Sequence, residues 1–186
     1  MKTKYILIAF FAFFQVANVV KGKQTTEPQV NSLHNFVFQN KSVHWISIYK
    51  DSADSSAVIV QLLFKQLSQT KNLNNIQIVG NTITGKILNE SSTNLLTSSH
   101  NTEIATFFIE IKNGKYRVDV HDIRISITSD NALSGSTSNM TYTIEKLYTK
   151  KDCTAWKNSA NKGTTLLDEE YNKYFKLIKN PQKSTW

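Results

Sequence analysis

Apolar and polar residues alternate in two runs that meet at Asn113-Gly114, within the segment FFIEIKNGKYRVDVHDIRISI at residues 107–127. An Asn-Gly pair between alternating runs predicts a β-hairpin with a two-residue turn. The turn sets the cross-strand pairs: Lys112 with Lys115, Ile111 with Tyr116, Glu110 with Arg117, Ile109 with Val118, and Phe107 with Val120. Apolar residues then meet on one face and charged residues on the other, as cross-strand pairing prefers. We expect this hairpin to form the central pair of an antiparallel sheet.

The second run of this hairpin changes the parity of its apolar positions. Tyr116, Val118 and Val120 occupy one parity, whereas Ile123, Ile125 and Ile127 occupy the other. These residues share one face only if the strand carries one extra residue, so we predict a β-bulge at His121-Asp122 that bends the strand. The outward-facing side chains would then be Arg117, Asp119, His121, Asp122, Arg124 and Ser126, opposite Phe108 and Glu110.

The N-terminal half contains signals for two strands, a helix and a second hairpin. Strands are predicted at Phe36–Phe38 and at Val43–Tyr49, which is rich in β-branched and aromatic residues. After cap-type residues at 51–54, apolar residues recur with helical period at Val60, Leu63, Phe64 and Leu67. The second hairpin spans residues 76–87 and turns at Gly80-Asn81. Gly85 within it predicts a bulge, or the close approach of a helix side chain or backbone.

The C-terminal half is more polar. Two segments rich in Ser, Asn and Thr, Asn89–Thr102 and Ser129–Asn139, are typical of surface loops. A last strand is predicted at Met140–Tyr148, and an irregular basic segment follows at residues 150–163. A final helix is predicted at residues 165–180, with Thr165 and Asp168 spaced as a capping box and Asn180-Pro181 as its end. Its apolar stripe consists of Leu167, Tyr171, Tyr174, Phe175 and Ile178.

The first 22 residues have the pattern of a secretory signal peptide. Lys2 and Lys4 precede an unbroken apolar run at residues 5–14, and small residues suit cleavage after Gly22 or after Ala17. An uncleaved anchor is the alternative. No Cys follows the apolar run, so we expect an exported protein, periplasmic or extracellular, that is not a lipoprotein and has no membrane span after cleavage. We expect a flexible lead-in at residues 23–35, a single α+β domain at 36–180 and a tail at 181–186.

Charge and cysteine content exclude several classes of protein. The formal net charge is +8 for the whole chain. Without Lys2, Lys4 and Lys21, 19 basic and 14 acidic residues remain, a net charge of about +5. Basic residues are spread along the chain rather than concentrated, so we expect no nucleic-acid partner. The single cysteine, Cys153, excludes an intramolecular disulfide and a cysteine metal cluster.

The order of these signals resembles an uncharacterised bacterial family of small exported proteins, a domain of unknown function with a TATA-binding-protein-like fold. The likeness covers residues 43–127 and departs from the family at Gly80-Asn81, where Asp residues are frequent. The matching positions are Ile78, Ile83, Gly85, Lys86, Ile87, Gly114, Lys115, Tyr116, Arg117, Asp122 and Ile123. The resemblance implies a curved antiparallel sheet with helices packed on one face. It implies no known reaction, and transferring DNA binding from the fold label would be analogy alone.

The sequence contains no recognisable catalytic or metal-binding motif. The four histidines, His34, His44, His100 and His121, have no zinc-ligand spacing, and neither a phosphate-binding glycine loop nor a nucleophile elbow is present. The sequence therefore predicts no catalytic residue, no cofactor and no metal ligand.

Three hypotheses for function remain. In the first, the chain is a non-enzymatic binding or structural module of the cell envelope, with an unidentified partner and an undetermined oligomeric state. Its binding face consists of Phe108, Glu110, Arg117, Asp119, His121 and Arg124. The alternative for the same stripe is a solvated sheet face stabilised by pairing of Glu110 with Arg117. In the second hypothesis, the chain is a hydrolase that uses His121 and Asp122, with Ser126 nearby. In the third, it is a nucleic-acid binder, which the spread of basic residues disfavours.

Overall fold

The computed structural model describes residues 32–51, 54–90, 100–131 and 136–179. The first elements in chain order are strands β1 (Phe36–Gln39) and β2 (Ser42–Lys50), then helix α1 (Ser56–Ser68). Five strands follow: β3 (Leu73–Val79), β4 (Thr82–Asn89), β5 (His100–Lys112), β6 (Lys115–Asn131) and β7 (Ser136–Thr143). The described chain ends with α2 (Ile144–Tyr148), the 3-10 turn η1 (Lys151–Cys153) and helix α3 (Ala160–Phe175).

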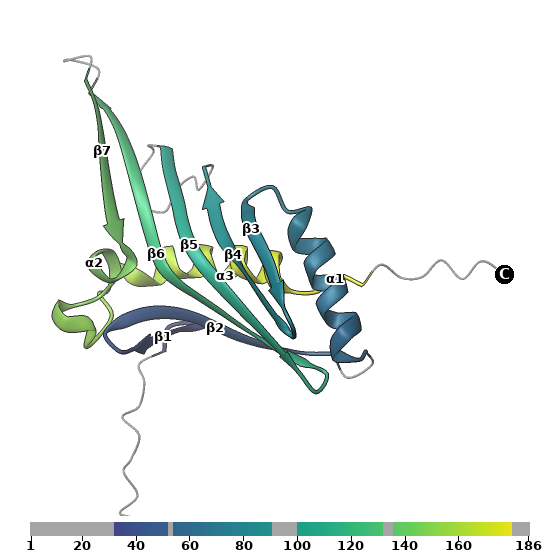
Figure 1. Ribbon diagram of the computed structural model, residues 1–186. Coiled ribbons are helices and arrows are strands. Elements are labelled where there is room, and N and C mark those ends of the chain that lie inside the picture. The colour runs from purple at the N-terminus through teal and green to yellow at the C-terminus, as the bar shows by residue number, and fades with distance from the viewer. Residues whose placement is uncertain (1–31, 52–53, 91–99, 132–135, 180–186) are drawn as a thin grey trace, which may run out of the picture.

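The strands form one antiparallel sheet in the order β1-β2-β6-β5-β4-β3, and β7 also pairs with β6. The long strand β6 has β5 along one edge and two partners in succession along the other. Residues 115–120 pair with β2, and residues 124–131 pair with β7. The sheet is curved, α3 crosses one of its faces and α1 lies beside β3 (Figure 1). This arrangement confirms the predicted α+β class and the curved sheet with helices on one face.

The core lies between the sheet and the two longer helices. Its buried strand residues include Trp45, Ile83, Ile87, Phe107, Ile109, Val118, Val120 and Ile125. Its buried helix residues include Ile59, Leu63 and Leu67 of α1, and Leu167, Tyr171 and Phe175 of α3. Each fully buried large apolar side chain stabilises the folded state by about 1.5–3 kcal/mol, so this contact holds the helices on the sheet.

The central hairpin has the predicted register. The pairs from Lys112 with Lys115 through Phe107 with Val120 all form. The predicted bulge is also confirmed, because the pairing shifts by one residue between Thr106–His121 and Ile104–Arg124. Asp122 is the extra residue and adopts a left-handed backbone with φ of 52°. Ile123 and Ile125 thereby return to the core face, where both are buried.

Gly85 is required by a neighbouring strand rather than by a helix. It lies opposite Phe107 of β5, and a Cβ at this position would stand 2.4 Å from the Phe107 ring. A bulge is present as well, but on the partner strand, where the register of β3 shifts between Asn74 and Gln77. The predicted close approach therefore comes from a side chain in the adjacent strand.

Both predicted polar loops are shorter than expected. Strand β4 continues to Asn89, β5 begins at His100, β6 extends to Asn131 and β7 begins at Ser136. The sequence conceals these strand ends because their inward positions are polar, as at Asn101 and Glu103, which are both buried. Residues 91–99 and 132–135 lie outside the described residues.

The predicted last strand, Met140–Tyr148, is wrong in its second half. Strand β7 ends at Thr143, whose hydroxyl accepts a hydrogen bond from the Lys146 amide and so caps α2. Ile144 and Tyr148 are then buried at helical i, i+4 spacing. The strand-like alternation of this segment masked the cap.

The C-terminal helix begins and ends about five residues earlier than predicted. The N-cap position of α3 is Ser159, so Thr165 and Asp168 lie inside the helix and form no capping box, and the first turn carries no acidic residue. Four residues of the predicted stripe are buried, but Ile178 lies beyond the helix and is 70% exposed. The Asn180-Pro181 signal lies outside the described residues.

Two junctions also differ from the expected pattern. The N-cap of α1 is Ser55, whereas Asp51 and Asp54 both form ion pairs with Lys179. Asn35, expected in a flexible lead-in, donates a hydrogen bond to Asp168 of α3. The chain is thus already tied to the fold before β1 begins.

Candidate functional site

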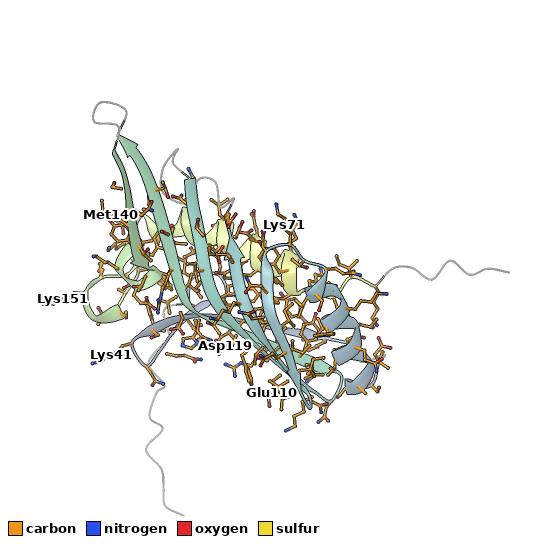
Figure 2. All side chains as sticks on the ribbon, turned by 45° about the horizontal axis from the view of Figure 1, so that its top comes forward. Lys41, Lys71, Glu110, Asp119, Met140 and Lys151 are labelled. Atoms are coloured by element: carbon orange, nitrogen blue, oxygen red, sulfur yellow. The ribbon has the colours of Figure 1, made fainter. Side chains whose placement is uncertain are left out.

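The sheet face opposite α1 and α3, which we call the open face, carries all six predicted binding residues. They alternate with buried core residues along β5 and β6, so their side chains point away from the helices. Phe108 lies opposite Asp119 and Glu110 lies opposite Arg117. Asp119 is farther from the hairpin tip than Glu110, and both are labelled in Figure 2. Phe108 is 39% exposed, an apolar ring among charged groups.

The predicted pairing of Glu110 with Arg117 is correct in register but not in side-chain contact. The Arg117 guanidinium instead forms an ion pair with Asp119, two residues along its own strand, with Nη2 at 3.3 Å from Oδ2. Among the described residues, Glu110 forms no ion pair within 4.0 Å. The carboxylate of Glu110 is therefore left to solvent.

A residue that the sequence did not single out, His44, joins the open face beside Asp119 and His121. His44 belongs to β2 and follows the register that pairs Trp45 with Val120, which places it beside His121 of β6. The two imidazole rings stack, with centroids 5.6 Å apart and an interplanar angle of 29°. Oδ1 of Asp119 lies 2.7 Å from Nδ1 of His44 and 3.6 Å from Nδ1 of His121. We call these three residues the His-Asp cluster.

Asp119 is the electrostatic centre of the cluster. Burial by itself would raise the pKa of Asp119, but the hydrogen bond with His44 and the nearby charged groups, Arg117 among them, hold that pKa below its usual range. Its carboxylate is therefore ionised at neutral pH. Imidazole nitrogens with a carboxylate oxygen form a donor set that suits transition-metal ions.

The sequence contained only part of the signal for this cluster. Asp119 and His121, two residues apart on one predicted strand, had to share a face. His44 is 75 residues away from Asp119 in sequence and arrives only through the pairing of β2 with β6, which no local pattern specifies. No zinc motif could therefore have identified the three residues.

The side chains required by the hydrolase hypothesis are not brought together. Asp122 lies in the bulge with an exposed side chain, and among the described residues it forms no hydrogen bond or ion pair. Ser126 accepts a hydrogen bond from Thr141 of β7. The carboxylate nearest to His121 is that of Asp119 rather than that of Asp122.

Three lysines form a row across the open face near the hairpin tip. Lys115 of β6 lies opposite Lys112 of β5 on one side and opposite Lys50 of β2 on the other. All three side chains are exposed. Like charges placed directly opposite each other destabilise a sheet, so this row opposes folding. The pair of Lys112 with Lys115 follows from the predicted hairpin register. Lys50 joins the row only through the pairing of β2 with β6.

A shallow groove of about 380 Å³ adjoins this lysine row. It is lined by Ile48, Glu110, Lys112, Asn113, Lys115, Tyr116 and Arg117. Ile48 is 63% exposed, so the groove combines apolar surface with cationic groups. A second groove of about 350 Å³ lies at the bulge, where β6 changes partner from β2 to β7, and includes Arg124 in its lining.

A buried polar group lies on the opposite, core face. Glu103 of β5 is fully buried, and its Oε1 accepts a hydrogen bond of 2.5 Å from the Tyr171 hydroxyl of α3. Burial raises the pKa of Glu103 to about 8; the Tyr171 hydrogen bond lowers it and the nearby Glu170 carboxylate raises it. Among the described residues, Oε2 of Glu103 and the side-chain amide of Asn101 have no hydrogen-bond partner.

Comparisons with known proteins support the fold. No protein-family model matches the chain, and no curated protein matches it. A solved structure of a TBP-like protein from Parabacteroides distasonis has a TM-score of 0.55 at 15% identity, covering 75% of this chain and 94% of that one. A DUF4468 family protein from Bacteroides ovatus has a TM-score of 0.52 at 13% identity, covering 77% and 90%.

Within the described residues, no helix is both long enough and apolar enough to cross a membrane. At 13% and 15% identity, the likeness to the two bacterial structures concerns the fold alone. It agrees with the family resemblance read from the hairpin residues. The chain therefore has the TATA-binding-protein-like fold, shared with bacterial proteins that include a member of a domain-of-unknown-function family.

Proposed function

We propose that this chain is an exported, non-enzymatic binding module of the cell envelope, and that the open face of its sheet binds an acidic segment of a partner protein. The observation that carries the proposal is the lysine row of Lys50, Lys112 and Lys115, three like charges placed side by side on neighbouring strands. Such a row reduces the stability of the isolated fold, and a partner that supplies carboxylates would reverse that cost.

The surroundings of the row favour a polypeptide over a nucleic acid. Exposed Ile48 and Phe108 offer apolar contacts, whereas Glu110 and Asp119 place negative charge on the same face. A phosphate backbone carries a negative charge at every nucleotide and would meet these carboxylates, whereas a peptide can direct its carboxylates to the lysine row and its apolar side chains to Ile48 and Phe108. The groove beside the row is shallow and open, which suits a macromolecular surface better than an enclosed small ligand.

Titration with a fluorescent peptide of alternating glutamate and leucine, followed by anisotropy, tests the binding face. The unsubstituted chain should bind, and added salt should weaken the binding. The double variant Lys112→Glu/Lys115→Glu should lose affinity about tenfold or more, equivalent to about 1.4 kcal/mol. The control Lys65→Glu/Lys162→Glu changes net charge equally at exposed helix positions and should bind like the parent. Absence of binding by the parent, or equal losses in both variants, would contradict the proposal.

Export rests on the N-terminal sequence, where lysines precede an apolar run and small residues precede the expected cleavage positions. Cell fractionation with N-terminal sequencing tests it separately. The mature chain should be found outside the cytoplasm and begin at Lys23, for cleavage after Gly22, or at Asn18, for cleavage after Ala17. Recovery of the chain in the cytoplasm with Met1 intact would contradict export while leaving the binding face to be judged by the peptide titration.

A further inference from the structure

We propose that His44, Asp119 and His121 form a binding site for a divalent transition-metal ion, with Zn²⁺ as the ion that its donor atoms suit. The inference goes beyond the binding of an acidic partner and does not depend on it. The two surfaces share the open face, but none of the three lysines that carry the peptide proposal is a ligand of the metal site. Metal binding can therefore fail while peptide binding succeeds, and the reverse.

The donor atoms already lie close enough to share one ion. One nitrogen from each histidine and one carboxylate oxygen all fall within 4.8 Å of one another. Ligand bonds of about 2.0–2.1 Å in tetrahedral geometry separate neighbouring donors by about 3.3 Å. The distance from Asp119 Oδ1 to His121 Nδ1 is 3.6 Å, and that to His44 Nδ1 is 2.7 Å. Zn²⁺ binding requires side-chain rotations that bring both distances to about 3.3 Å.

The surrounding groups hold the ligands in orientation. Arg117 binds Oδ2 of Asp119 and leaves Oδ1 directed toward the imidazoles, which is the role that outer-shell partners have in metal sites. Stacking of the two rings restricts their rotation. All three ligands project from paired strands rather than from loops, so the backbone keeps them in place. The side chains are 20%, 15% and 32% exposed for His44, Asp119 and His121, which gives an ion access and leaves room for water as a fourth ligand.

The donor set determines which ions should bind. Two imidazole nitrogens and one carboxylate oxygen suit Zn²⁺, Ni²⁺ and Cu²⁺, whereas Mg²⁺ and Ca²⁺ prefer sites built from oxygen alone. When the ion binds Nδ1 of His44, the proton between this nitrogen and Asp119 Oδ1 is displaced; it passes to solvent from an imidazolium and to Nε2 of the same ring from a neutral imidazole. The ion thus exchanges one hydrogen bond for three ligand bonds.

Isothermal titration of the full chain with ZnCl₂, without a polyhistidine tag, tests the site. The parent should bind one equivalent of Zn²⁺, and MgCl₂ should give no binding. His44→Asn and His121→Asn should each weaken Zn²⁺ binding by about tenfold or more, because each removes one of three protein ligands. His34→Asn is the matched control, since His34 contacts Asn161 and Thr165 of α3 and lies outside the cluster. It should bind Zn²⁺ like the parent.

A second measurement needs no variant. Zn²⁺ should protect His44 and His121 of the parent protein from modification by diethylpyrocarbonate, mapped by mass spectrometry, while His34 is modified at an unchanged rate.

A third measurement compares melting temperatures with and without Zn²⁺. Zn²⁺ should raise the melting temperature of the parent and of His34→Asn, but not of the two cluster variants. Three results would each overturn the proposal: no Zn²⁺ binding by the parent, undiminished binding in both cluster variants, or equal protection of all three histidines.

Discussion

Gly85 shows how one missing side chain allows two strands to approach. The Phe107 ring from β5 lies over its Cα, and the ring is itself buried against Phe175 of α3. Because Phe107 is enclosed on both sides, it cannot turn aside to admit a methyl group. The glycine therefore sets the position of the Phe107 ring in the core.

Gly85→Ala should destabilise the fold by about 1–3 kcal/mol, because the new Cβ would stand 2.4 Å from the Phe107 ring. Urea unfolding followed by tryptophan fluorescence measures the loss. The substitution should cost less in a Phe107→Leu background, with a coupling of at least about 0.5 kcal/mol in a double-mutant cycle. Gly80→Asn is the control, since Gly80 has open space around it and Asn tolerates its φ of 58°. Additive losses would show that the ring is not the obstacle.

Asp168 connects α3 to strand β2 and to the residue just before β1 through single hydrogen bonds. Its Oδ1 accepts from the indole Nε1 of Trp45 and from Nδ2 of Asn35, both at 2.7 Å. Trp45 is fully buried, so its N–H group has no access to water if the carboxylate is removed. This role replaces the capping role that the sequence suggested for the same residue.

Asp168→Ala should therefore cost about 1–3 kcal/mol of unfolding free energy, the penalty for a buried donor without a partner. Asp168→Asn retains one acceptor oxygen and should recover part of the loss. Glu169→Ala removes an exposed carboxylate from the next position of the same helix and should have little effect. Thermal or urea unfolding compares the three variants, and equal stability of Asp168→Ala and Glu169→Ala would refute the assigned role.

The bulge in β6 is the element that shapes the sheet. It lies between the segment paired with β2 and the segment paired with β7, at the point where the strand changes neighbours. An extra residue increases local twist, which lets two strands share one edge of β6 in different directions. The same kink leaves His121 on the open face at the end of the β2 ladder.

Asp122→Val should destabilise the fold by about 1–2 kcal/mol, because a β-branched residue tolerates the left-handed backbone at φ of 52° poorly. Asp122→Gly should stay within about 1 kcal/mol of the parent, since glycine adopts this conformation freely. Arg124→Val, at an exposed position of the regular strand nearby, controls for the β-branched side chain. Equal stability of the Val and Gly variants at position 122 would indicate a regular ladder instead of a bulge.

Local pattern predicted those parts of the fold that local chemistry determines. The Asn113-Gly114 turn fixed the hairpin register, and the parity change located the bulge, because both are properties of neighbouring residues. The β6–β7 extension was missed because its Ser and Thr residues alternate with no apolar face, so strand and loop look alike. The start of α3 was missed because Asp168 resembles a first-turn acid, whereas its actual partners, Trp45 and Asn35, are distant in sequence.

The candidate site was predicted in part for the same reason. The six open-face residues follow from the hairpin, which the sequence specifies. His44 and Lys50 join them only because β2 pairs with β6, and the paired residues lie 65 to 75 positions apart in sequence. A non-local pairing of this kind depends on the packing of the whole sheet, so the His-Asp cluster and the lysine row became visible only in three dimensions.

The molecule as a whole encloses polar groups where its long strands meet α3. Asn101 and Glu103 occupy inward positions of β5, and Tyr171 of α3 meets Glu103 there. With a pKa of about 8, against 4.5 as its ordinary value, Glu103 is protonated in the folded protein at neutral pH and ionised in the unfolded chain. Folding therefore takes up a proton, and the stability of the protein depends on pH.

The direction in which pH changes the stability follows from the number of protons that the folded and unfolded states bind. Between about pH 4.5 and 8 the folded state holds one more proton than the unfolded state at Glu103, so the free energy of unfolding falls as pH rises. The slope from this group approaches about 1.4 kcal/mol per pH unit, and it vanishes above the folded-state pKa. Glu103→Gln has nearly the same shape and stays neutral at every pH. Relative to the parent, this variant should gain stability steadily as pH rises from 5 to 8.

Urea unfolding at several pH values tests this expectation, with the stability difference between variant and parent plotted against pH so that all other titrating groups cancel. Glu110→Gln, which removes an exposed carboxylate of the same strand, should give a nearly level difference and serves as the control. A level difference for Glu103→Gln as well would mean that Glu103 is ionised in the folded protein.

Tyr171→Phe removes the hydrogen bond that lowers the pKa of Glu103. In this variant, the pH at which the free energy of unfolding stops falling should therefore be higher than in the parent.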